Sequence, residues 1–179
     1  IAGGAASGKS AWAESLAMAL GGRKCYIATM EPFGEEAEIR IQHHRNARRE
    51  KGFQTAEIYT GMAHSVGTLC CDTALLECMT NWMANEMYSP SGAGKDALGA
   101  VKKGIDALCA AVSNLVVVSG DLFCEGLDYG PYTGEYLENL AEVSRCLSAR
   151  ADLVVELCCG IPIVHRHNDV GRAWLEKMA

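Results

Sequence analysis

The chain has 179 residues, 49% hydrophobic and 21% charged, which is long enough for one domain over residues 1–179 to bury a core. Its net charge of −6 argues against a strongly basic surface of the kind that binds nucleic acid. No apolar run is long enough to cross a bilayer, and we recognise no signal peptide. We therefore expect a cytoplasmic protein without a membrane span.

The nine cysteines do not form a recognisable metal or disulfide pattern. No two of them have Cys-x-x-Cys spacing, which zinc and redox motifs use. Several lie in apolar runs, where reduced cysteine serves as a small core residue. In a reducing compartment we expect free thiols.

The strongest motif lies at the start of the chain. Residues Gly3-Gly4-Ala5-Ala6-Ser7-Gly8-Lys9-Ser10 match G-x-x-x-x-G-K-[ST]. Glycines allow backbone turns that direct successive N–H groups toward an anion, and Lys9 is expected at the β- and γ-phosphates. Ser10 is expected to ligate Mg²⁺. The motif predicts a nucleotide-binding loop, the alternative being a glycine-rich strand-to-helix turn. Because only two residues precede it, we expect native sequence before Ile1.

Strands and helices are predicted to alternate along the chain. Strands are predicted over residues 25–29, 54–59, 72–77, 115–119, 152–157 and 161–164. Helices are predicted over residues 10–20, 35–51, 62–69, 78–88, 96–113 (capped by Asp96), 133–150 and 169–178. This order predicts an α/β fold with a mostly parallel sheet and helices on both faces. Ligands bind at the carboxyl ends of such strands, so residues 3–10, Thr29, Glu77 and Asp121 are expected along one edge.

A second Gly-Lys pair, Gly94-Lys95, lies in the loop-like stretch 89–94. Ser89 occupies the position of the first glycine of a phosphate loop, and no strand is predicted before it. We therefore predict that Lys95 does not bind phosphate.

The predicted helix over residues 35–51 carries adjacent histidines, His43 and His44. Successive helical residues point about 100° apart, so only one of the two can face a given target. A single histidine on a helix is usually solvated or packed. Alternatively, a histidine flanked by Arg40 and Arg45 can attack the α-phosphorus of a nucleotide, while the arginines neutralise phosphate charge.

Several blocks together resemble the bifunctional adenosylcobinamide kinase / adenosylcobinamide-phosphate guanylyltransferase family of cobalamin biosynthesis. They are residues 3–10, Tyr26-Ile27-Ala28-Thr29, Arg40-Ile41-Gln42-His43-His44-Arg45, Thr55-Ala56-Glu57 and Leu75-Leu76-Glu77-Cys78-Met79-Thr80. The resemblance implies a P-loop (RecA-like) fold, a homotrimer and two reactions. ATP or GTP would phosphorylate adenosylcobinamide, and GMP would then pass from GTP, through a guanylylated histidine, to give adenosyl-GDP-cobinamide.

The resemblance also implies site residues. It makes His43 the catalytic, covalent residue, Ser10 the Mg²⁺ ligand, and GTP, ATP and Mg²⁺ the cofactors. The implied nucleotide contacts are Gly3, Gly4, Ala5, Ala6, Ser7, Gly8, Lys9, Ser10, Thr29, Met30, Glu31, His44, Arg45, Asn46, Ala47, Glu57 and Glu77. For Glu77 two roles stay open, Mg²⁺ coordination and a hydrogen bond to the guanine edge.

The chain departs from the family pattern at several positions. The family usually has Arg at position 6 and an Asn/Ser-Glu pair at 120–121, where this chain has Ala6 and Gly120-Asp121. An expected Arg is replaced around Gly134-Glu135, and an expected Asn is Ser144. Two alternatives therefore stay open: a diverged small-molecule kinase without guanylyl transfer, and a non-catalytic nucleotide-binding module.

Overall fold

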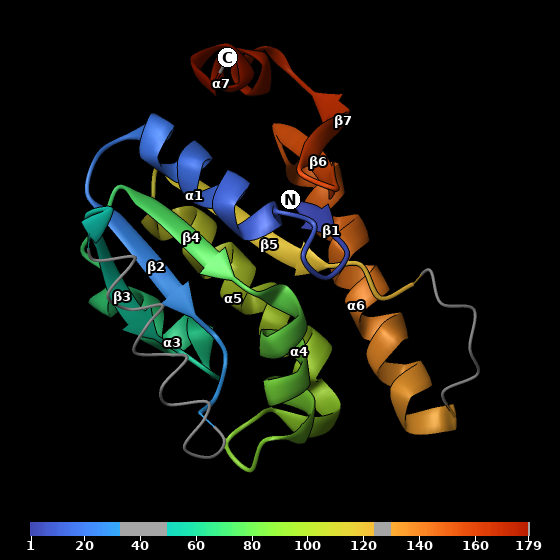
Figure 1. Cartoon of the computed structure of the whole chain (residues 1–179). Helices are drawn as coiled ribbons and strands as arrows, with labels where there is room; N and C mark the ends of the chain where they lie inside the picture. Colours follow the sequence, from blue (N-terminus) through green and yellow to red (C-terminus); the bar gives the residue numbers. More distant parts are fainter. Residues whose placement is uncertain (33–49, 124–129, 179) are drawn as a thin grey trace.

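The fold is described from a computed structural model for residues 1–32, 50–123 and 130–178 (Figure 1). The predicted helix over residues 35–51 lies almost wholly outside these ranges, so its structure stays a prediction. Within the described ranges, no helix has both the length and the apolar character needed to span a membrane.

A seven-stranded sheet forms the centre of the described part of the chain, with strand order β3-β2-β4-β5-β1-β6-β7. The strands are β1 (Ala2–Gly3), β2 (Lys24–Ala28), β3 (Phe53–Glu57), β4 (Thr73–Glu77), β5 (Asn114–Gly120), β6 (Leu153–Cys158) and β7 (Ile161–His167). All neighbouring pairs are parallel except β6 and β7, which form an antiparallel hairpin. The predicted α/β fold with a mostly parallel sheet is confirmed.

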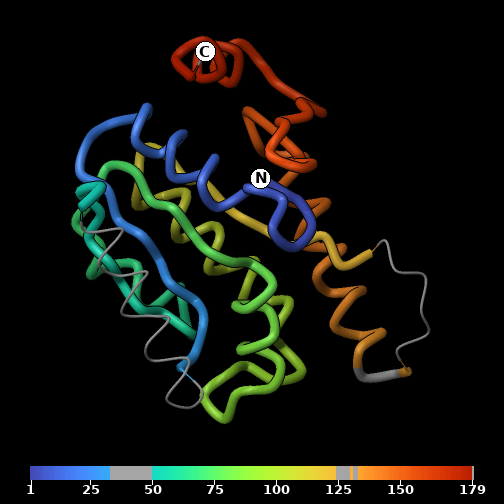
Figure 2. Tube along the Cα trace, viewed as in Figure 1, coloured from blue at the N-terminus to red at the C-terminus, as the bar shows by residue number. Residues whose placement is uncertain are grey.

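Helices cover both faces of this sheet, as predicted. They are α1 (Lys9–Leu20), α3 (Met62–Ser65), α4 (Met79–Tyr88), α5 (Ala97–Ala111), α6 (Gly130–Arg150) and α7 (Asp169–Met178), with 3₁₀ turns η1 (Val66–Thr68) and η2 (Gly94–Asp96). The helices α1 and α7 lie on one face, and α3, α4, α5 and α6 pack on the other (Figures 1 and 2).

Alternation along the central strands explains why both faces are apolar. Leu75 of β4 packs beneath α1, whereas Leu76 points to the opposite face and packs with Trp82 of α4. Successive strand residues point to opposite faces, so a strand buried on both sides reads as a continuous apolar run. The predicted strand over residues 72–77 has this composition, and residues 74–76 are fully buried.

Several element boundaries differ from the prediction, and two of these differences have a clear physical reason. Strand β7 runs to His167 rather than residue 164, because its second half continues to pair with β6 as far as Leu153. Helix α6 begins at Gly130 rather than after Tyr132. Proline is favoured in the first turn of a helix, where its missing N–H has no partner to lose, so Pro131 continues the helix.

The predicted capping role of Asp96 is wrong. Asp96 precedes α5, but its carboxylate makes no capping hydrogen bond. The residue ends the 3₁₀ turn η2 with φ −96° and ψ 15°, whereas a capping side chain needs an extended backbone. Its carboxylate instead lies 4.0 Å from Lys103 Nζ on the surface.

The packing of α5 against α4 depends on the absence of a side chain at Gly104. A Cβ atom there would lie 2.6 Å from Trp82 Cζ2 and 3.0 Å from Met62 Cβ. Trp82 is fully buried, so it has no space into which it could move. Close approach, and not backbone flexibility, therefore explains a glycine in the middle of this helix.

We expect Gly104→Ala to lower the free energy of unfolding by about 1–3 kcal/mol, through overpacking, although alanine is the better helix former. Gly134→Ala in α6 is the matched control, because a Cβ there has nothing within 4 Å. That change should raise the stability by roughly 0.5–1 kcal/mol. Urea unfolding measures both. Equal effects of the two substitutions would contradict the packing argument.

Candidate functional site

The phosphate loop, residues 3–8, turns from β1 into α1. A Cβ at Gly3 would lie 2.6 Å from Ser7 Oγ and 2.7 Å from the Leu157 carbonyl, so only glycine fits there. Gly8 has φ 89°, in the left-handed region that favours glycine, directly before α1. The Ser7 N–H donates to the Gly4 carbonyl over 3.3 Å, and Lys9 Nζ donates to the same oxygen over 2.9 Å. The lysine therefore lies over the loop that precedes it.

Ser7 carries a buried hydroxyl group inside this loop. The residue is 8% exposed, and its Oγ has no hydrogen-bond partner among the described residues. A buried hydroxyl without a partner costs free energy, so the loop offers an unused polar atom to a ligand. Together with the N-terminus of α1, which carries a partial positive charge, this atom suits an anionic group.

The Glu77 carboxylate, at the end of β4, connects the start of α1 to β2. Ser10 Oγ donates to Glu77 Oε1, and Tyr26 OH donates to Glu77 Oε2 over 2.5 Å. Tyr26 is buried and packs edge-on against Phe53, with ring centroids 6.2 Å apart and planes at 90°. Serine and glutamate oxygens side by side are the kind of donors that Mg²⁺ prefers, and Mg²⁺ commonly keeps its other ligands from phosphate and water.

The ends of β2, β3 and β4 are level with one another. Ala28 is in register with both Glu57 and Glu77, so Thr29 and Glu77 share an edge as predicted, and Glu57 lies at the same edge. Thr29 is fully buried, and its hydroxyl donates to the Cys78 carbonyl over 2.8 Å and accepts from the Cys78 N–H over 2.7 Å. Its hydroxyl thus joins the ends of β2 and β4.

The next two residues along the edge continue toward solvent. Met30 is 40% exposed, and Glu31 accepts a hydrogen bond from Ser89 Oγ over 3.1 Å. The described chain stops at Pro32, next to these residues, and resumes at Glu50. Further predicted site residues lie outside the described residues: His43, His44, Arg45, Asn46 and Ala47.

Two residues of α4 hold this edge together and were not predicted. Asn85 Nδ2 donates to the carbonyls of Thr29 (2.7 Å) and Tyr59 (3.1 Å). Glu86, 2% exposed, accepts hydrogen bonds from Gly61 N, Trp82 Nε1 and Ala93 N. In the sequence both look like ordinary polar residues of a helix surface. The carbonyls that Asn85 binds lie 56 and 26 residues away, and the bond from Gly61 to Glu86 spans 25 residues.

The end of β5 meets the phosphate loop from the other side. Asp121 N donates to the Gly3 carbonyl over 3.0 Å, which confirms the predicted position of Asp121 at this edge. A Cβ at Gly120 would lie 3.2 Å from Thr80 Cγ2 at the start of α4. The departure from the family pattern at position 120 therefore coincides with a close approach of two elements, where a side chain would press on Thr80.

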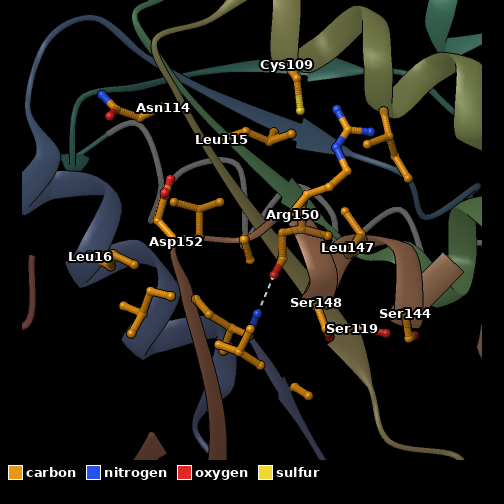
Figure 3. Close-up of a pocket in the computed structure, with 18 of the residues that line it drawn as sticks. Leu16, Cys109, Asn114, Leu115, Ser119, Ser144, Leu147, Ser148, Arg150 and Asp152 are labelled. Atoms are coloured by element: carbon orange, nitrogen blue, oxygen red, sulfur yellow. Dashed lines mark hydrogen bonds between the residues drawn. The ribbon is translucent and has the colours of Figure 1, made fainter. Parts of the chain in front are cut away.

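A cavity of about 590 Å³ lies between β5, α6 and β6, in line with the short β1 (Figure 3). Its lining is mainly aliphatic, including Leu16, Leu115 and Leu147. The Ile1 nitrogen donates to the Val117 carbonyl at its margin over 2.8 Å. Its lining runs along β5 from Asn114 to Gly120 and includes Asp121, but it contains neither Glu77 nor Lys9, so we do not assign the chemistry to it.

The comparisons with known proteins point to one enzyme family. Residues 1–165 match the family described as cobinamide kinase / cobinamide phosphate guanyltransferase. A bifunctional adenosylcobalamin biosynthesis protein of Pseudomonas aeruginosa is 27% identical over 168 residues, which cover 91% of this chain and 94% of that protein. The corresponding protein of Salmonella typhimurium is 36% identical over 94 residues, 51% of each chain.

Among solved structures, a KaiC-like protein of Pyrococcus horikoshii matches 94% of this chain and 77% of its own, with a TM-score of 0.51 and 8% identity. At that identity the likeness concerns the fold alone. The family match covers nearly the whole chain, and its members are transferases with kinase and guanylyltransferase activities. The chain therefore belongs to the cobinamide kinase / cobinamide phosphate guanyltransferase family of cobalamin biosynthesis.

Proposed function

We propose that this chain transfers the γ-phosphoryl group of ATP or GTP to adenosylcobinamide and then transfers GMP from GTP, through His43, to give adenosyl-GDP-cobinamide. The observation that carries the proposal is the joint position of Lys9, Ser10 and Glu77. These residues meet at the same sheet edge as Met30 and Glu31, where the described chain leads toward the segment with His43.

The phosphate loop supplies the triphosphate end of this site. Lys9 provides a mobile positive charge, and the N-terminus of α1 provides oriented N–H groups. Charge-assisted hydrogen bonds to phosphate are stronger than neutral ones, so these groups carry most of the affinity. The positive contact that the family usually has at position 6 is absent, because Ala6 occupies it.

We assign the side-chain oxygens of Ser10 and Glu77 as the protein ligands of Mg²⁺. A serine of the phosphate loop with a carboxylate at the end of a nearby strand is the arrangement that phosphate-loop enzymes use to hold this ion. A bound Mg²⁺ would neutralise phosphate charge. This contact favours the metal role of Glu77 over a hydrogen bond to guanine. Tyr26 holds the same carboxylate in place.

Guanylyl transfer needs a nucleophile for the α-phosphorus. In the proposed step a neutral His43 nitrogen bonds to that phosphorus, the α–β phosphoanhydride bond breaks, and pyrophosphate leaves. A terminal phosphate oxygen of adenosylcobinamide phosphate then displaces the histidine and takes the GMP. Arg45 would neutralise charge during both displacements.

We also propose that the chain forms a homotrimer. The edge strand β7 has exposed apolar side chains, and we assign this face as the contact between subunits.

We expect Lys9→Ala to weaken binding of a fluorescent GTP analogue about 100-fold, because it removes a charge-assisted contact to phosphate. Lys95→Ala is the matched control, since Lys95 follows a glycine in the same way but lies exposed in η2. That variant should bind within about twofold of the unchanged protein. An equal loss in both variants would refute the assignment of the phosphate loop.

We expect Glu77→Gln to raise the Mg²⁺ concentration needed for half-maximal kinase turnover about tenfold, because the metal loses a charged ligand. The amide keeps the shape of the side chain but accepts from only one of the two hydroxyl groups, so the melting temperature should fall, and turnover is compared at a temperature where both proteins are folded. Glu138→Gln, on the exposed surface of α6, controls for the change of charge. An unchanged Mg²⁺ dependence would point to the guanine edge instead.

We expect His43→Ala to abolish covalent GMP labelling and to spare phosphorylation of adenosylcobinamide. Mass spectrometry of peptides after incubation with GTP detects the adduct, which should be stable in base and labile in acid. His44→Ala is the matched control and should keep the label. Labelling that persists in His43→Ala and disappears in His44→Ala would assign the covalent role to His44. If the unchanged protein takes no label, only the kinase reaction of the proposal would remain.

A further inference from the structure

The turn between β6 and β7 has a residue that its geometry does not favour. Cys158 pairs with Ile161, which leaves Cys159 and Gly160 as the two central residues. Their φ angles are 50° and 82°, as in a type I′ turn. Asparagine, aspartate or glycine normally occupies the first of these positions, and another side chain in the left-handed region costs about 1 kcal/mol. Turn geometry therefore does not account for the cysteine.

Cys158 and Cys159 present two thiols side by side at the surface. Both residues are exposed, and they are neighbours in the chain. The other adjacent pair is different, because Cys71 is buried, which leaves only Cys70 exposed. Within the described residues, Cys158 and Cys159 are thus the one adjacent pair with both thiols open to reagents.

This pair is poorly placed to form a disulfide. Neighbouring Cα atoms across a trans peptide are about 3.8 Å apart, whereas disulfides usually span about 4.4–6.8 Å. Among the described residues the only cis peptide bond lies elsewhere in the chain, and the ladder holds the turn on both sides. A bridging atom bonded to both sulfurs avoids that constraint. The negative charge of a neighbouring thiolate also raises the pKa of Cys158.

The turn lies directly against the phosphate loop. Gly160 N donates to the Ser7 carbonyl over 2.9 Å, and a Cβ at Gly8 would lie only 3.4 Å from Gly160 Cα. Figure 2 shows the β6–β7 turn beside the loop that leads into α1. A group bonded to both sulfurs would thus change the backbone that holds Ser7.

We propose that Cys158 and Cys159 form a chelating dithiol site for trivalent organoarsenic compounds, and that its occupation weakens nucleotide binding by the phosphate loop. An arsenoxide, R–As=O, would form two As–S bonds and lose its oxygen, which leaves as water with the two thiol protons. Arsenic stays trivalent, so no oxidant or reductant is needed. The second half of the proposal rests on the proposed nucleotide function, and the first half does not.

Intact-protein mass spectrometry with phenylarsine oxide tests the site. We expect one phenylarsenic group per chain, bridging Cys158 and Cys159 in peptide maps, resistant to a monothiol and removed by a dithiol. Cys158→Ser and Cys159→Asn should each lose this adduct, and Cys70→Ser should keep it. Asparagine suits the type I′ turn, so Cys159→Asn should melt at or above the temperature of the unchanged protein. A dithiol-reversible adduct that persists in Cys159→Asn would overturn the site.

Titration with a fluorescent GTP analogue tests the coupling. We expect the adduct to bind the analogue about tenfold more weakly than the untreated protein, consistent with the loss of one hydrogen bond to the loop. After the same treatment with phenylarsine oxide, Cys159→Asn should keep its affinity for the analogue. If the protein with the bound phenylarsenic group binds the analogue as tightly as the untreated protein, the coupling to nucleotide binding is overturned and the dithiol site is not. Failure of the untreated protein to bind the analogue would refute the proposed function, and the mass result would still decide the dithiol site.

Discussion

The hydrogen bonds to the Glu77 carboxylate connect the parts of the chain from which the site is built. Ser10 opens α1, Tyr26 lies on β2, and Glu77 ends β4. In the sheet β5 separates β4 from β1, so backbone pairing alone does not bring the phosphate loop to β4. Each hydrogen bond to a charged group contributes about 1.5–3 kcal/mol, which is large beside the marginal stability of a domain. The same carboxylate that organises the edge is thus the group we assign to metal binding.

The phosphate loop is held from outside as much as by its own contacts. Gly160 donates to it from the β6–β7 turn, and Asp121 donates to it from the end of β5. The Leu157 carbonyl lies so close to Gly3 that no side chain fits between them. A hairpin at the exposed end of the sheet is therefore part of the support of the nucleotide site, which gives its two thiols a route to affect binding.

Sequence reasoning succeeded where the determining interactions are local. The strand over residues 73–77 and the helix that follows the phosphate loop follow from apolar patterning and from glycine positions. It failed at Asp96, where a 3₁₀ turn changed the backbone, and at the end of β7, where pairing with β6 extended the strand. Asn85 was missed because both its partners are distant in sequence, and Glu86 because its bond to Gly61 spans 25 residues. The role of His43 stays a prediction, since it lies outside the described residues.

By itself the sequence determined the order of the elements, the phosphate loop and the family, because glycine spacing, apolar periodicity and motif residues are properties of short segments. Only the tertiary structure decided that Glu77 meets Ser10, 67 residues away, and that the Cys158–Cys159 turn lies against Ser7. The reason is physical. Such contacts depend on how helices and strands pack across the whole sheet, and no local pattern records which distant side chains that packing brings together.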